Sequence, residues 1–115
     1  MPYIRTQFEQ LPEDASAQAI ESTAEGLERY HFEPFLILDA PDFIHWRKKD
    51  MLAEYDRLTT LSPDAPELTA VVGSTPSQVV EKQLGLLLYH YHLLCRLRTD
   101  DASAWDVVHE LYEDD

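Results

Sequence analysis

Histidine is the side chain best suited to metal binding or proton transfer, and the sequence contains five of them. His90 and His92 lie two residues apart in a run that we expect to be helical, so they point to different faces of the helix. Asp42 and His45 lie three apart, and each could supply a ligand. Metal sites in helical bundles, however, use a Glu-x-x-His pattern repeated on two helices, and this chain has no such repeat. We therefore predict no metal site and no cofactor.

The other groups that could do chemistry are an aromatic cluster and one thiol. The cluster Tyr89-His90-Tyr91-His92 could line a pocket, but no carboxylate stands at helical spacing to orient a ring nitrogen. Cys95 lies in a Leu-rich run, which is typical of a small buried hydrophobic residue. The chain contains no Gly-x-Ser-x-Gly, P-loop or Gly-rich dinucleotide motif. These residues give no positive sign of an enzyme.

Charge is the most informative property of the sequence. Twenty-two acidic and nine basic residues give a formal net charge of −13. Like charge repels nucleic acid and anionic membranes, so we expect neither as a direct partner. Acidic surfaces also serve solubility alone, and that interpretation stays open. The chain has no basic, apolar leader, no run long enough to span a bilayer and a single cysteine, which together predict a cytoplasmic protein.

The acidic excess lies at the two ends of the chain. Residues 1–46 contain nine acidic and two basic side chains, and residues 100–115 contain seven acidic side chains and no basic one. Within each end, three carboxylates repeat at spacings of three and four, which places them about 5–6 Å apart along one helix face. The two rows are Glu21, Glu25, Glu28 and Asp106, Glu110, Glu113.

These rows suggest a docking surface. Like charges at such spacings lower the stability of a helix by a few tenths of a kcal/mol per pair. A sequence that tolerates this cost on two helices could be using the charges to attract a cationic surface. Phosphates along a nucleic-acid strand are spaced comparably, so an acidic face can occupy a groove that binds DNA or RNA. Trp46, beside the basic run 47–49, is a suitable aromatic anchor for a partner.

The elements that must position these residues are helices. The length suits one domain over residues 1–115, and three glycines argue against a β-sandwich or barrel. Apolar spacing and breaker residues predict helices over 15–29, capped by Asp14, and over 41–60, capped by Asp39. They also predict a helical turn over 67–72, a helix over 76–98 after a Thr75 cap, and a last helix over about 101–113. Residues 1–12 fit an edge strand or a loosely docked arm, and residues 34–39 a short strand or an extended connector.

The fold class that follows is all-α, a compact bundle of about four helices. The helix over 76–98 is apolar almost all round from residue 84 to residue 97, so we place it at the centre. One stripe of it differs, and it is either the exposed face or a face over which another helix packs closely at its glycine. That stripe consists of Lys82, Gly85, Tyr89, His92 and Arg96.

The leading functional hypothesis is a non-enzymatic acidic protein that docks on a basic surface of a partner protein, as a nucleic-acid-mimicking inhibitor or antagonist. The partner-binding residues would be the two acidic rows and Trp46. A second hypothesis is a small helical enzyme or metal protein that uses His45, His90, His92 or His109. A third is a self-associating structural or adaptor protein, so a homodimer is also open.

Overall fold

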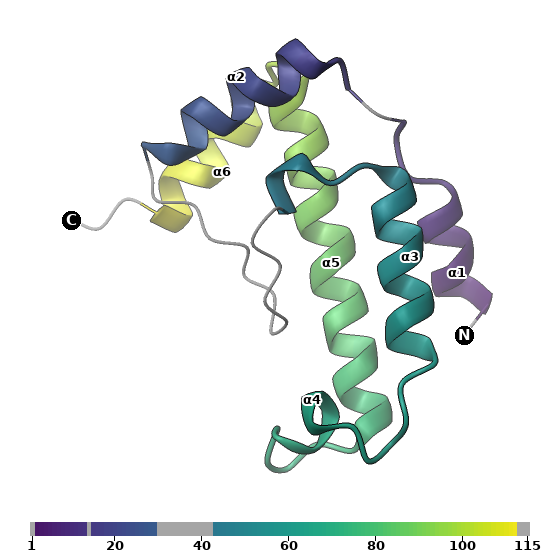
Figure 1. The fold of residues 1–115 in the computed structure, drawn as a ribbon. Coiled ribbons are helices and arrows are strands. Elements are labelled where there is room, and N and C mark those ends of the chain that lie inside the picture. The colour runs from purple at the N-terminus through teal and green to yellow at the C-terminus, as the bar shows by residue number, and fades with distance from the viewer. Residues whose placement is uncertain (1, 14, 30–42, 113–115) are drawn as a thin grey trace.

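The computed structural model of the chain describes residues 2–13, 15–29 and 43–112 (Figure 1). All regular secondary structure in these ranges is helical, so the fold is all-α as predicted. The elements are α1 (Pro2–Glu9), α2 (Ala17–Glu28), a 3-10 helix η1 (Phe43–His45), α3 (Lys48–Thr59), α4 (Pro66–Thr69), α5 (Pro76–Arg98) and α6 (Ala102–Tyr112).

Helix α5 begins and ends where the sequence predicts and lies at the centre of the bundle. Thr75 Oγ1 accepts a hydrogen bond from Gln78 N at 3.2 Å, and Gln78 Oε1 accepts one from Thr75 N at 2.9 Å. This capping box satisfies two of the backbone groups that a helix start leaves unpaired, and Pro76 suits the first turn. Helices α2, α3, α4 and α6 all contact α5 (Figure 1).

The polar stripe of α5 is its solvent face. Lys82, Gly85, Tyr89, His92 and Arg96 are all exposed. A Cβ built on Gly85 would meet no atom within 4 Å, so none of the described helices packs over this glycine. The close-packing alternative is therefore wrong.

Two pairs of helices flank α5 (Figure 1). Helix α3 packs along α5, and α1 packs on α3, where the rings of Phe8 and Tyr55 have centroids 4.9 Å apart. At the C-terminal end of α5, helices α2 and α6 lie side by side (Figure 1). There, the Arg98 guanidinium donates a hydrogen bond to the carbonyl of Ile44 and so fastens η1 to α5.

The start of the chain is a helix, so the edge strand, one of the two alternatives for this segment, is wrong. Residues 2–9 form α1, and Phe8 and Leu11 are 0% and 2% exposed. Apolar residues at positions 4, 8 and 11 are spaced for one helix face, which buries the latter two against the core. With those two side chains buried, the segment is packed into the bundle and does not lie over it as a loose arm.

The helix expected over 41–60 is two separate elements. Residues 43–45 form η1, and α3 starts only at Lys48. Arg47 is extended, with φ −118° and ψ 174°, and its N–H donates to Asp50 Oδ2 at 2.8 Å. The Asp50 carboxylate therefore helps to start a new helix here, although the apolar spacing by itself continues without a break.

Side chains also cap the starts of α2 and α6. The side chain of Ser16 caps α2, accepting from Ala19 N at 3.2 Å; Asp14, Asp39 and residues 34–39 lie outside the described residues. Asp101 Oδ1 accepts from Ser103 N at 2.9 Å at the start of α6. Hydrogen bonds from Ser103 and Arg96 lower the pKa of Asp101 to about 2, because they stabilise its charged form.

A glycine on α2 makes room for an aromatic side chain of α6. A Cβ on Gly26 would lie 2.5 Å from Cη2 of Trp105, much closer than van der Waals contact. The absence of a side chain at this position therefore lets the indole pack directly on the backbone of α2.

The two helical glycines make a matched pair for measuring this contact. We expect Gly85→Ala to raise the free energy of unfolding by about 0.5–1 kcal/mol, because alanine favours the helix and meets nothing. Gly26→Ala should instead lower the free energy of unfolding by about 1 kcal/mol, because the cost of displacing the indole exceeds the gain in helix propensity. Urea unfolding of both variants checks this. Equal stabilisation by the two substitutions would contradict the close packing of α2 on α6.

Candidate partner-binding surface

The acidic row on α2 faces solvent. Glu21, Glu25 and Glu28 are all exposed. Within the described part of the chain, none of them forms an ion pair. Their negative charge is therefore directed outward, and no described cation forms an ion pair with it.

The acidic row on α6 is described for two of its three members. Asp106 and Glu110 are exposed and form no ion pair with a described residue. Glu113 lies outside the described residues. The inward face of α6 buries Ala104 and Val108, which are both 0% exposed. This burial orients the helix with its two described carboxylates outward.

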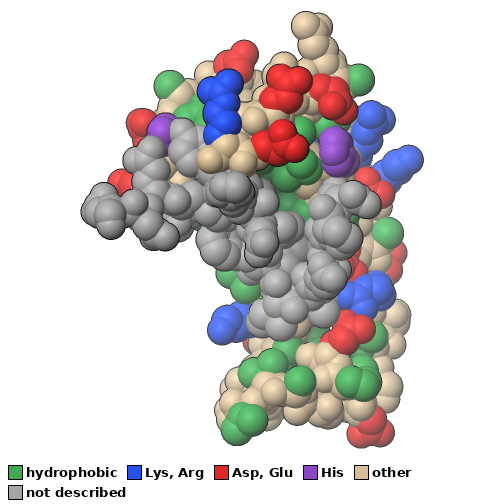
Figure 2. Space-filling model, turned by 60° about the vertical axis from the view of Figure 1, so that its left-hand side comes forward, with side chains coloured by type: hydrophobic (Ala, Val, Ile, Leu, Met, Phe, Trp, Pro, Cys, Tyr) green, Lys and Arg blue, Asp and Glu red, His purple; other side chains and the backbone are tan. Residues whose placement is uncertain are grey.

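The fold brings the two rows to the same end of the molecule. They come from opposite ends of the sequence, yet α2 and α6 lie side by side (Figure 1). Figure 2 shows Asp and Glu side chains gathered over this end, with basic side chains among them. Together these helices form a predominantly acidic surface, defined here as the α2–α6 surface: Glu21, Glu25, Glu28, Asp106 and Glu110.

A shallow groove runs between the two helices. Its volume is about 320 Å³, and its lining includes Ser22, Glu25, Gly26, Arg29, Trp105 and His109. Arg29 and His109 are functional candidates that the charge pattern did not single out. Arg29 lies four residues after Glu25, and His109 lies four residues after Trp105, so the two residues of each pair share a helix face. Arg29 and His109 therefore bring side chains that can carry positive charge into the groove. The acidic surface is therefore interrupted along its midline.

Trp46 lies in a different hollow. This side chain is half-buried and packs on Phe43, with ring centroids 5.3 Å apart. The hollow around it has a volume of about 260 Å³ and is formed on α3, with no lining residue from α2 or α6. The structure thus does not join Trp46 to the acidic rows in one site. The residues that line the hollow are Trp46, Asp50, Ala53, Glu54 and Arg57.

The basic groups near Trp46 are partly engaged within the fold. Lys48 Nζ lies 3.3 Å from Glu13 Oε1. The Arg57 guanidinium pairs with Glu54 on its own helix and reaches Glu67 on α4 at 2.8 Å. The hydrogen bonds to Glu54 and Glu67 raise the pKa of Arg57. The Arg57–Glu67 pair connects α3 to α4, and the Lys48–Glu13 pair connects α3 to the segment that follows α1.

The histidines occupy separate places in the fold. His45 and His92 are exposed, His109 is half-buried, and His90 is 2% exposed, with its Nδ1 at 2.7 Å from the Leu86 carbonyl oxygen. Among the residues that the structure describes, no group of three or more His, Cys, Asp or Glu side chains is placed to share a metal ion. The aromatic cluster around His90 divides between core and solvent, since Tyr91 is buried and Tyr89 is 52% exposed.

No family model matches the chain, and no curated protein or solved structure is significantly similar to it. In the described ranges, no helix combines the length and apolar character needed to cross a bilayer.

Burial of His90 predicts a pH-dependent stability. Burial lowers the pKa of His90, with a smaller opposing effect from the hydrogen bond to Leu86. The unfolded chain therefore takes up a proton near the ordinary histidine pKa of about 6.5, at a pH where the folded protein does not. The stability that the neutral ring provides is present above this pH and is lost as the pH falls below it.

We expect the free energy of unfolding to decrease less in His90→Gln than in the wild type between about pH 7.5 and about pH 5, as measured by urea unfolding. His92→Gln, which changes an exposed histidine on the same helix, should leave the wild-type pH dependence in place. If both variants keep the wild-type profile, His90 does not titrate as its burial predicts.

Proposed function

We propose that this protein is a non-enzymatic binding protein whose α2–α6 surface docks on a basic surface of another protein. The observation that supports the proposal is the placement of five exposed carboxylates on two adjacent helices without a described ion-pair partner. Such an arrangement is costly to the isolated fold, because like charges three or four residues apart repel. A cationic partner would remove that cost on binding.

The charges would act mainly on the rate and specificity of association. A surface of one sign raises the local concentration of an oppositely charged partner and orients its approach. Short-range affinity would come from the groove, where the Trp105 indole lies between α2 and α6 beside Arg29 and His109. Aromatic and arginine side chains of this kind are the usual anchors of protein interfaces.

The partner class that fits best is a nucleic-acid-binding protein. Its basic groove is built to receive regularly spaced negative charges, and the rows on α2 and α6 offer such charges on rigid helices. Occupation of that groove would exclude the nucleic acid. The protein would then act as an inhibitor or antagonist, and it would not itself bind nucleic acid.

The test separates the position of the charges from their total. Glu21→Gln/Glu28→Gln removes two charges from the α2–α6 surface, and Asp64→Asn/Glu81→Gln removes two exposed charges elsewhere, so both variants have the same net charge. Tagged forms of each would be used to recover partners from lysate of the native host, with quantitative mass spectrometry as the readout.

We expect the first variant to weaken capture of a basic partner about tenfold, because each lost charge-assisted contact contributes a fraction of a kcal/mol to about 1 kcal/mol. The second variant should bind as the wild type does. Equal loss in both would show that only net charge matters, and no loss in either would show that α2 does not contact the partner.

A further inference from the structure

The groove between α2 and α6 combines a flat aromatic ring with a carboxylate. Trp105 lines it from α6, and Glu25 lines it from α2. The indole is half-buried and the carboxylate is exposed, so an incoming group can touch both. The groove therefore offers one ligand two different kinds of interaction, stacking and charge pairing.

The indole is held in place by the fold. A Cβ on Gly26 would lie 2.5 Å from Cη2 and 3.0 Å from Cζ2 of Trp105, so one edge of the ring rests on the backbone of α2. The same side chain packs against the hydrophobic core. A ring fixed by these contacts loses little conformational freedom when a ligand stacks on it, which favours binding.

The electrostatic surroundings of the groove favour a cation. Residues 17–29 and 102–112 contain five carboxylates and one arginine, a formal net charge of −4 with histidine neutral. Arg29 lines the groove, but its single positive charge does not reverse the sign of the surface. The surface repels an anion, and an apolar group would cover the charges of Glu25 and Arg29 without replacing their water.

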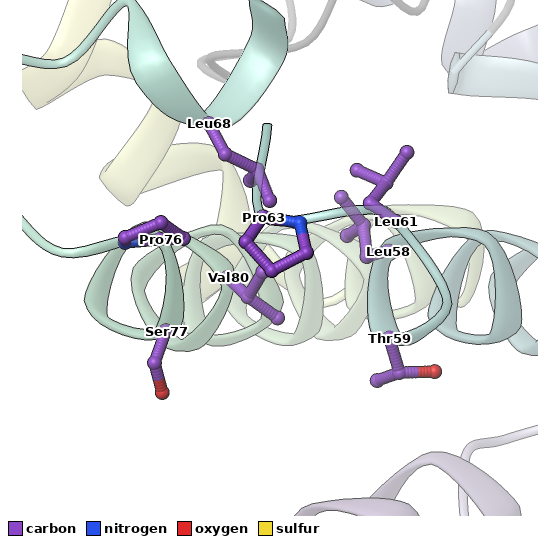
Figure 3. A pocket seen from close by; sticks show the side chains of 8 residues that line it. All are labelled: Leu58, Thr59, Leu61, Pro63, Leu68, Pro76, Ser77 and Val80. Carbon is purple, nitrogen blue, oxygen red and sulfur yellow. The ribbon is translucent and has the colours of Figure 1, made fainter. Parts of the chain in front are cut away.

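A concavity of similar size elsewhere in the fold lacks both features. It has a volume of about 330 Å³ and lies between α3, α4 and the first turns of α5 (Figure 3). Figure 3 shows Pro63, Leu68 and Val80 around its centre, and its lining includes no charged or aromatic side chain. A cation would meet neither a carboxylate nor a ring there, so this pocket is an internal reference for binding at the groove.

Of the two cationic side chains that a basic protein surface carries, arginine fits the groove better. Its guanidinium is planar, so it can stack on an indole and also pair with a carboxylate through two parallel hydrogen bonds. The lysine ammonium is a compact charge that holds its water more strongly.

We propose that an arginine side chain of a basic partner protein inserts between α2 and α6, with its guanidinium stacked on the Trp105 indole and paired with the Glu25 carboxylate. The inference rests on the proposed function and adds the side chain by which the partner is recognised. The other carboxylates of the α2–α6 surface attract the partner, and the groove selects arginine over lysine.

An NMR titration of the full chain with two peptides of equal charge, hexa-arginine amide and hexa-lysine amide, tests the proposal. We expect hexa-arginine to bind about fivefold to tenfold more tightly, because only the guanidinium gains the stacking contact. The indole N–H signal of Trp105 should shift on binding. The indole signal of Trp46 and the amide signals of Leu68 and Ser77, which lie outside the groove, should stay in place.

Matched variants separate the ring and its carboxylate from the overall charge. Trp105→Leu should abolish the preference for arginine and leave hexa-lysine binding nearly unchanged, because every carboxylate remains. Glu25→Gln should reduce the preference, whereas Glu21→Gln, which removes an equal charge outside the groove, should weaken both peptides equally. Both glutamates are exposed, so these two variants test the site without disturbing the core, and circular dichroism would verify the fold of Trp105→Leu.

The outcomes distinguish this inference from the proposed function. Equal binding of the two peptides, with shifts on α2 and α6, would overturn the arginine site and leave the acidic docking surface standing. No shift on α2 or α6 with either peptide would contradict the docking surface itself. A shift of the Trp105 indole signal with inorganic phosphate, and none with hexa-arginine, would show that the groove receives an anion and would also overturn the proposal.

Discussion

The burial of α5 organises the whole fold. Ten of its residues are buried, and four of the other helices contact it directly. A helix that is apolar on most of its surface cannot remain in water, so the shorter amphipathic helices must cover it. Beyond its first turns, α5 is exposed along the stripe through Gly85. The covering helices gain their stability from this contact, because short helices are marginal in isolation.

The position of the acidic surface is a consequence of that packing. Helix α5 is long enough to separate the two ends of the molecule, with α2 and α6 at its C-terminal end and α4 at its N-terminal end (Figure 1). The contact of Gly26 with Trp105 then brings α2 and α6 together. Charges that are remote in sequence become one surface, and the nearly uncharged stretch 58–80 lies at the far end. This polarity places the proposed partner-binding surface and the nearly uncharged stretch at opposite ends of α5.

The sequence predicted the long central helix well because its signals are local. A Thr-Pro start with Gln78 at the third helical position and a sustained apolar run define α5 without reference to the rest of the chain. The break before α3 was missed because it depends on one hydrogen bond, from the Arg47 N–H to Asp50, within a pattern that otherwise continues. Helix α1 was missed because eight residues give too few apolar positions to distinguish a helix from a strand.

The candidate site could be predicted only in part. The spacing of Glu21, Glu25 and Glu28 placed them on one exposed face, and the structure has them there. Their proximity to α6 depends on packing between distant segments, which no local pattern encodes. The same holds for Arg29 and His109 in the groove.

The proposed function requires that electrostatic attraction to the α2–α6 surface steers a basic partner toward the protein. The most direct test is the association rate constant of the purified protein with its recovered partner, measured by stopped-flow fluorescence over a range of ionic strength. An attractive surface predicts a rate that falls steeply with salt, because ions screen charges beyond a Debye length of about 10 Å at 0.1 M. A rate that is independent of salt, or that rises with it, would contradict the account.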